Sequence, residues 1–192
     1  MCLTIRPVTP ADHAAMLAIY APYVQNTAVS FEVEVPTLAA FADRLADIAA
    51  FYPCLVCQAG GEVAGYAYAS RHRQRAAYDY DVDVSIYVAP RWQGTGAAAR
   101  LYESLFALLA AQGVYNAYAA TALPNPRSVR FHEKLGFAVI GTHHRTGYKL
   151  GGWHDVLWLE KALRPLDGAP VPVCPMCALP EAVVAAALAG KP

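Results

Sequence analysis

A glycine turn, PRWQGTG at residues 90–96, is the feature that most constrains the fold, because it joins an alternating stretch to an alanine-rich one. Residues 78–88, YDYDVDVSIYV, place mainly acidic and polar side chains on one face and valine and isoleucine on the other, which is typical of a half-buried strand. After the turn, leucines at helical spacing predict a helix that ends near Gly113. The chain therefore contains a strand–turn–helix unit with two glycines where the helix begins.

The first backbone N–H groups of a helix have no partner within the helix, and a glycine turn leaves them accessible to an anion. Gly94 and Gly96 carry no Cβ, so a phosphate can approach the backbone closely, and Arg91 can add positive charge at the edge. The glycine pair alone fits equally well a tight turn that only packs closely. The flanking strand and helix favour the phosphate-binding interpretation.

The rest of the chain interleaves short apolar strands with helices, which predicts an α/β domain with a mixed sheet. A helix follows Thr9, which we interpret as its N-cap, another covers 37–51, and a short one begins at Asn125 and ends at Gly136. The other expected strands are 3–7, both arms of a hairpin around Gly60 and Gly61, 114–122, 137–149 and 153–162.

Proline becomes frequent after residue 163, in RPLDGAPVPVCPMCALP. This composition predicts a domain over residues 1–163 and a proline-rich tail over 164–192 that is extended on the surface or mobile. A short apolar stretch, EAVVAAALA, follows within this tail.

Composition excludes several classes of function. Lysine plus arginine number 15 and aspartate plus glutamate 15, so the zero net charge argues against a broad nucleic-acid surface. No signal peptide is recognised, and the uncharged run 104–126 is a poor membrane span because Gln112-Gly113 and Pro124-Asn125 interrupt it. We therefore expect neither a nucleic-acid partner nor membrane insertion. Five cysteines, an odd number, favour a reduced protein in the cytoplasm.

We predict no metal. Cys174 and Cys177 form a single CxxC, which is a weak zinc signal without a second pair. His143, His144 and His154 lack the spacing of a metal site.

Three polar residues share one stripe of the short helix. Asn125, Ser128 and His132 lie at positions i, i+3 and i+7, beside apolar Phe131 and Leu135, which suits a partly buried ligand. A capping asparagine and a half-buried histidine without a ligand explain the same pattern. Arg127 and the other charged residues fall on other faces and are interpreted as solvated.

The motif RWQGTGA resembles the pyrophosphate loop of the GNAT superfamily of N-acetyltransferases, and NPRSVRFHEKLGF resembles its second coenzyme A segment. Together with AYDYDVDVSIYV and GYKLGGWHDVLWLEKAL, these blocks are similar to the phosphinothricin and methionine sulfoximine N-acetyltransferases over residues 3–163. The resemblance implies a mixed, mostly antiparallel central sheet of about seven strands flanked by about four helices. It also implies acetyl-CoA as co-substrate, with its pyrophosphate on the glycine turn. The implied cofactor-binding residues are Tyr87, Val88, Arg91, Gln93, Gly94, Thr95, Gly96, Ala97, Asn125 and Ser128.

Acetyl transfer to an amine requires a base for the ammonium and a proton for the leaving thiolate. Asp83 is our candidate base, since its core-like neighbours should desolvate it and raise its pKa. The resembling family has glutamate here, so a relaying water becomes more plausible; a surface aspartate in an acidic run is the alternative. His132 matches a histidine of that family and can act as acid or base near neutral pH.

The acceptor is expected to be a small acidic amine. Arg73 and Arg75 can pair with a carboxylate or phosphinate, and the resemblance adds Tyr78 and Phe31 to this site. Simple loop charge is the alternative for the two arginines.

Together these features predict direct transfer from acetyl-CoA to a small amino-acid-like acceptor within a ternary complex. An enzyme for another amine, such as a protein N-terminus or a polyamine, and a non-catalytic acyl-CoA sensor remain alternatives. The apolar content of 56% and the resemblance both favour a homodimer.

Overall fold

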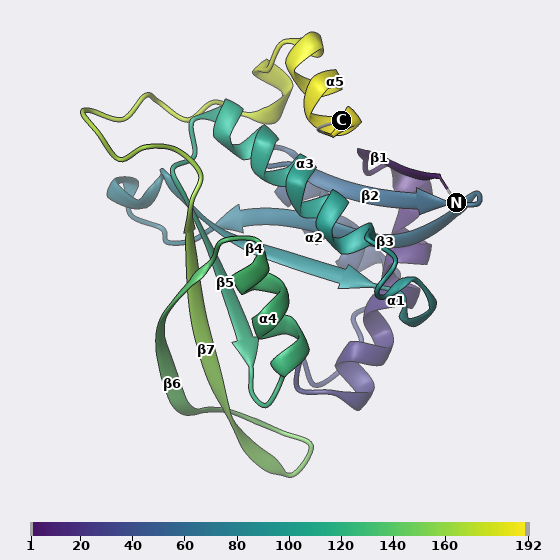
Figure 1. Ribbon diagram of the computed structural model, residues 1–192. Coiled ribbons are helices and arrows are strands. Elements are labelled where there is room, and N and C mark those ends of the chain that lie inside the picture. The colour runs from purple at the N-terminus through teal and green to yellow at the C-terminus, as the bar shows by residue number, and fades with distance from the viewer. Residues whose placement is uncertain (1, 191–192) are drawn as a thin grey trace.

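The computed structural model describes residues 2–190, which form one seven-stranded sheet with helices on both faces (Figure 1). The strand order is β1-β2-β3-β4-β5-β7-β6, and every neighbouring pair is antiparallel except β4 and β5. The expected mixed, mostly antiparallel α/β fold is confirmed. The strands are β1 (Leu3–Pro7), β2 (Cys54–Ala59), β3 (Glu62–Arg71), β4 (Asp81–Val88), β5 (Asn116–Ala122), β6 (Ala138–Lys149) and β7 (Gly152–Ala162). The helices are α1 (His13–Asn26), α2 (Leu38–Ala49), α3 (Ala97–Gln112), α4 (Pro126–Lys134) and α5 (Glu181–Ala189).

Two apolar cores hold the helices to the sheet. On one face, the leucines of α3 pack on small residues of the central strands, including Ala67, Val82 and Ala117. On the other face, α1 and α2 bury Met16 and Phe41 against large side chains of β2 and β3. Successive side chains of β4 point to opposite faces of the sheet. Its polar side chains therefore lie on the face that α1 covers.

The strands β4 and β5 pair over only three residues. Their parallel register runs from Asp81 opposite Asn116 to Asp83 opposite Tyr118 and then stops. Beyond that point each strand keeps its outer neighbour, β3 for β4 and β7 for β5. The centre of the sheet therefore opens into a gap that carries unpaired strand edges, next to the start of α3.

One predicted boundary beside this gap differs, and two predicted helix caps can be compared with the structure. The strand expected from residue 78 begins at Asp81, because residues 76–78 form a 3-10 turn first. Helix α2 begins after Thr37, whose hydroxyl accepts from the Ala40 N–H at 3.2 Å, and this cap is why it starts where the sequence suggested. Thr9 likewise precedes the first N-terminal helical turn, which is a 3-10 turn that leads into α1.

Part of the proline-rich tail is folded. Its apolar stretch forms helix α5, which packs on α3 and β1 and was not predicted as a helix. Gln112 at the end of α3 donates to the carbonyls of Phe51 and Cys174 at 2.9 and 2.8 Å, which ties the tail to the domain. No helix among residues 2–190 is both long and apolar enough to cross a membrane.

Candidate active site

The glycine turn has the backbone geometry that only glycine adopts readily. Gly94 and Gly96 have φ of +81° and +93°, in the left-handed region, and Gly96 is the N-cap of α3. A Cβ built at Gly96 would meet no atom within 4 Å, so the space in front of the turn is open. The N–H groups of the first turn of α3 therefore face a place where an anion can sit.

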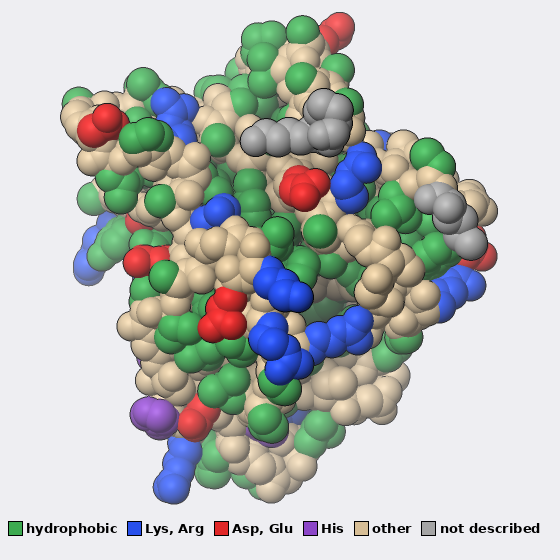
Figure 2. Space-filling view, in the orientation of Figure 1, with side chains coloured by type: hydrophobic (Ala, Val, Ile, Leu, Met, Phe, Trp, Pro, Cys, Tyr) green, Lys and Arg blue, Asp and Glu red, His purple; other side chains and the backbone are tan. Residues whose placement is uncertain are grey.

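Two adjoining cavities lead from this turn into the gap in the sheet. The outer one, about 370 Å³, is lined by Gly94, Gly96, Arg127 and apolar side chains. The inner one, about 80 Å³, lies between β4 and β5 and ends at His132. Both are bordered by Val29, Ile86, Asn125 and Ser128, so together they form one donor cleft. Figure 2 shows Lys and Arg side chains gathered around a hollow on this face, close to where α3 and α4 lie in Figure 1.

Gln93 connects the turn to both walls of the donor cleft. Its Nε2 donates to the Tyr23 hydroxyl at 3.0 Å, and its Oε1 accepts from Arg127 Nη1 at 2.6 Å. Arg127, interpreted from the sequence as solvated charge, thus lines the donor cleft. Arg91 instead pairs with Glu62, outside the cleft, so the structure does not bring it to the phosphate position.

The other predicted donor residues lie around the turn and the end of β4. Ala97 is fully buried, and the Thr95 hydroxyl donates to the Trp92 carbonyl at 2.6 Å. Ala89 N–H donates to Ala64 O of β3 at 2.9 Å, so alternation turns the Val88 N–H toward the opposite side, the gap. Tyr87 borders the inner cavity while its ring packs against aromatic residues of α1 and β3.

Helix α4 presents His132 to the inner cavity in one tautomer. Asn125 caps the helix by accepting from the Ser128 N–H at 3.1 Å, as the ligand-free alternative expected, and it also borders both cavities. His132 Nδ1 donates to the Ser128 carbonyl at 2.9 Å, which leaves Nε2 to accept from the Tyr102 hydroxyl at 3.3 Å. Burial lowers the pKa of His132, so the neutral imidazole is favoured, with its Nε2 lone pair directed at the Tyr102 hydroxyl.

The acidic run separates into three environments. Asp79 pairs with Arg71, and Asp81 accepts from Asn116 Nδ2 at 2.9 Å. Asp83 lies deeper, and burial raises its pKa, although hydrogen bonding to His72 opposes the rise. His72 Nδ1 lies 2.8 Å from Asp83 Oδ1.

His72 was not among the residues predicted from the sequence. A signal for it existed in the hairpin: Ser70 lies opposite Asp83 in the β3–β4 register, so residue 72 lies diagonally across from Asp83 on the same face.

Two shallow cavities lie on the expected acceptor side of the gap, and His72, which contacts Asp83, lines one of them. Phe31 borders one of about 270 Å³, and Arg73 borders one of about 310 Å³; both share His143 and Trp158. Gly147 of β6 lies against the Phe31 ring so closely that a Cβ would overlap it. Tyr78 is 41% exposed with its ring edge toward His72, whereas Arg75 is exposed and borders neither cavity.

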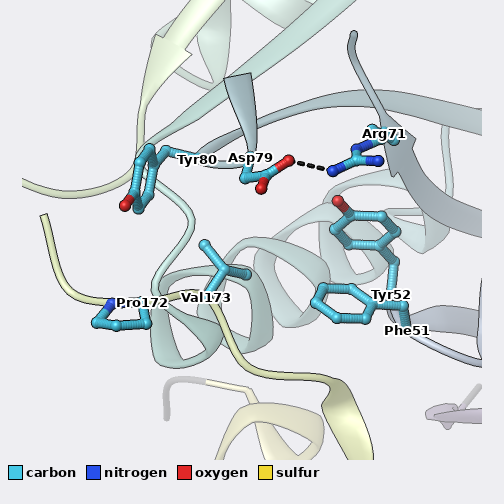
Figure 3. A pocket seen from close by; sticks show the side chains of 7 residues that line it. All are labelled: Phe51, Tyr52, Arg71, Asp79, Tyr80, Pro172 and Val173. Atoms are coloured by element: carbon cyan, nitrogen blue, oxygen red, sulfur yellow. Dashed lines mark hydrogen bonds and ion pairs between the residues drawn. The ribbon is translucent and has the colours of Figure 1, made fainter. Parts of the chain in front are cut away.

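A separate cavity of about 550 Å³ lies under the tail, away from these residues. Figure 3 shows its walls, with Phe51 and Tyr52 on one side, Pro172 and Val173 of the tail on another, and the Arg71–Asp79 pair above. Since those two charges neutralise each other, this cavity offers no free cation for a phosphate. The donor cleft, not the larger cavity, has the chemistry of an anion site.

Among residues 2–190, no group of three His, Cys, Asp or Glu side chains is arranged to hold a metal ion. All five cysteines are unbridged, and Cys54 and Cys57 are buried in the core. None of the five borders the donor cleft or the acceptor cavities.

Comparison with known proteins shows the family to which the chain belongs. Residues 5–158 match the family described as acetyltransferase (GNAT) domain. The phosphinothricin N-acetyltransferase of Streptomyces viridochromogenes is 41% identical over 172 residues, covering 90% of this chain and 93% of that protein. The L-methionine sulfoximine/L-methionine sulfone acetyltransferase of Pseudomonas paraeruginosa is 34% identical over 174 residues, covering 88% and 100%. The crystal structure of a phosphinothricin acetyltransferase from Sinorhizobium meliloti in complex with AcCoA superposes with a TM-score of 0.85 at 33% identity, covering 89% and 94%.

Proposed function

Because this chain belongs to the GNAT family of acetyltransferases, we propose that it transfers the acetyl group of acetyl-CoA to the amino group of a small amino-acid-like acceptor. The observation that carries this proposal is the donor cleft, which begins at the glycine turn and ends at buried His132 between β4 and β5. The acceptor class follows relatives whose names give phosphinothricin and methionine sulfoximine as substrates. When bound, acetyl-CoA supplies an activated acetyl thioester.

On the donor side, backbone N–H groups of Gly94, Gly96 and Ala97 hold the pyrophosphate, since those of Gln93 and Thr95 donate to the carbonyls of Pro90 and Trp92. Gly94 and Gly96 give it access, and Arg127, which reaches across the cleft to Gln93, supplies positive charge. The Val88 N–H, turned toward the gap, donates to the acetyl oxygen as negative charge develops there.

Asp83 accepts a proton from the acceptor ammonium, which exposes the nitrogen lone pair. Partial burial raises the pKa of Asp83, so its carboxylate is a better base than a solvated aspartate. Aspartate is shorter than glutamate by one methylene, so a water between Asp83 and the amine completes the reach.

His132 moves the second proton. Its neutral Nε2 accepts the proton that the nitrogen loses once the new C–N bond has formed, and returns it to the sulfur as the C–S bond breaks. The products are an N-acetylated acceptor and free CoA thiol, and no bond to the protein forms. The cysteines do not line the site, which supports direct transfer over a covalent enzyme intermediate.

On the acceptor side, Arg73 pairs with the acidic group of the substrate while Phe31 packs against its carbon chain. Tyr78 and Arg75 lie at the outer edge of this region and contribute less to binding of the acceptor. An acidic group held at Arg73 lies beside Asp83, the residue that receives the proton.

Replacing Arg73 with alanine is therefore expected to raise the KM for an acidic acceptor by about 10- to 100-fold, the size of a charge-assisted hydrogen bond. The KM for acetyl-CoA should stay unchanged, since Arg73 lies outside the donor cleft. Steady-state kinetics with both substrates varied provide the measurement. Arg75→Ala is the matched control, because this arginine borders neither acceptor cavity. An unaltered acceptor KM in the Arg73 variant would contradict the assignment.

We further propose a homodimer. The β6–β7 hairpin carries Tyr148, Leu150 and Trp153 with 60%, 62% and 63% of their surfaces exposed, which is unusual for large apolar residues in an isolated monomer. Sedimentation at micromolar concentration should give twice the monomer mass, and a Trp153→Lys variant should shift it toward monomer. A monomer alone in the native protein would exclude this arrangement.

The unbridged cysteines support a reducing, cytoplasmic location.

Turnover of acetyl-CoA against a panel of amines tests the whole proposal. Acidic amino acids, phosphinothricin and methionine sulfoximine should be acetylated, with a peptide N-terminus and a polyamine as comparison acceptors. A preference for the peptide or the polyamine would show that the acceptor class is wrong, while the proposed acetyl transfer from acetyl-CoA would still hold. Binding of acetyl-CoA without turnover of any amine would identify a sensor instead.

A further inference from the structure

His72 lies directly beside the proposed base. It is the residue after the end of β3, and its Nδ1 is 2.8 Å from Asp83 Oδ1. Only 12% of the His72 side chain is exposed, against 36% for Asp83. A carboxylate accepts hydrogen bonds only, so Nδ1–H is the donor.

Aromatic contacts hold the imidazole in place. The His72 ring stacks on Tyr118 of β5, with centroids 4.5 Å apart and planes at 22°. The Trp158 ring of β7 meets it edge-on at 6.2 Å, and Tyr78 meets it at 6.3 Å. Because side chains of β5, β7 and the 3-10 turn before β4 surround this ring, its donor nitrogen is held in place beside Asp83.

We propose that His72 is a positioning residue for acetyl transfer: it holds Oδ1 of Asp83 and so directs Oδ2 toward the acceptor amine. This inference rests on the proposed function, in which Asp83 is the base. An aspartate that is one-third exposed otherwise rotates about its side-chain bonds and solvates both oxygens. The fixed orientation offsets the shorter reach of aspartate by restricting where the relaying water can bind.

The chain contains a second His–Asp contact that serves as a control. His144 Nδ1 lies 3.0 Å from Asp155 Oδ2, but 76% of the His144 side chain is exposed. That pair occupies the β6–β7 hairpin, makes no contact with Asp83 or His72, and borders neither the donor cleft nor the acceptor cavities. A His144→Phe variant therefore removes a comparable contact without disturbing the proposed base.

Three substitutions separate the hydrogen bond from the packing. His72→Phe keeps a ring to stack on Tyr118 but loses the donor, and is expected to lower kcat by up to about 100-fold. His72→Asn keeps an N–H close to the Nδ1 position, so it should recover most of the activity. His72→Gln places its N–H near the Nε2 position and should recover little. Equal kcat values for the Asn and Gln variants would overturn the proposal.

The pH dependence of kcat provides a readout that packing alone does not move. The charged and titratable groups around Asp83 are His72 and Arg73 from the β3–β4 connection and Tyr118 from β5. Since His72 lowers the pKa of Asp83 against the effect of burial, its loss should raise that pKa further. The acid limb of the profile should therefore move to higher pH in His72→Phe and stay in place in His144→Phe.

A double substitution closes the test. In an Asp83→Asn background, His72→Phe should cost less than threefold, because no carboxylate is left to direct. A further loss equal to that of the single His72 variant would show that His72 acts independently of Asp83, and the inference would fail while the proposed function stands. Full activity of Asp83→Asn alone would instead remove the base, and with it both the assignment and the inference.

Discussion

Asp83→Asn is expected to lower kcat by about 10²–10⁴-fold, the usual contribution of a general base, while acetyl-CoA affinity stays nearly constant. Asparagine keeps the size and the hydrogen-bonding capacity of the side chain but cannot take a proton from the ammonium. Burial raises the pKa of Asp83, so the native rate should fall as the pH drops through that pKa and Asp83 becomes protonated. In the Asp83→Asn variant, this fall of kcat at low pH should disappear. The difference in kcat between the variant and the native protein should shrink at high pH, where the amine is already deprotonated.

Asp79→Asn is the matched control for this experiment. It makes the same chemical change in the same acidic run, at a residue that pairs with Arg71 and lines the cavity under the tail instead of contacting His72. Its kcat should remain within a factor of two of native. If the pH–rate profile of Asp83→Asn matched the native one in shape and height, His132 or bulk water would have to be the base.

His132→Phe should lower kcat by a similar factor, about 10²–10⁴-fold, because the ring remains but both nitrogens are lost. The change removes Nε2, which faces the Tyr102 hydroxyl, and also the Nδ1 bond to the Ser128 carbonyl. His132→Asn distinguishes the two losses, because its amide can still donate to Ser128 O while nothing replaces Nε2. Both variants should release CoA thiol slowly in stopped-flow assays with a thiol reagent.

Calorimetric titration with acetyl-CoA controls for damage to the cleft in these variants. His132 borders the inner cavity, so affinity should change by less than about tenfold if its role is proton transfer rather than binding. A His132→Asn variant with near-native kcat would show that the Ser128 bond, and not Nε2, is what the native histidine contributes.

Features carried by neighbouring residues could be predicted from the sequence. The glycine turn, the alternation of β4 and the stripe of Asn125, Ser128 and His132 each depend on a local period or a local backbone requirement. In the structure, residues of all three features line the two adjoining cavities. The resemblance to known acetyltransferases gave the mixed, mostly antiparallel sheet and the use of acetyl-CoA, which local patterns alone do not determine.

Features that depend on two distant segments could not be predicted in the same way. Arg127 has a solvent-facing position in the helical period, yet it reaches 34 residues back to Gln93 across the donor cleft. Arg91 occupies the motif position, and in the structure its guanidinium pairs with Glu62 of β3, a contact that the local pattern does not indicate. Helix α5 was missed because its nine residues contain no polar face, and only contact with α3 and β1 makes it stable.

The separation of β4 from β5 gives this enzyme an edge strand in the middle of its sheet. Edges normally lie at the outside, where they invite pairing with any extended chain. Here the edges lie inside a cleft beside α4, so only a narrow extended molecule can use them. A carrier with amide groups spaced along its arm can take the place of the missing strand, whereas a compact acetyl donor such as acetyl phosphate cannot. The gap therefore selects the carrier of the acetyl group rather than the group itself.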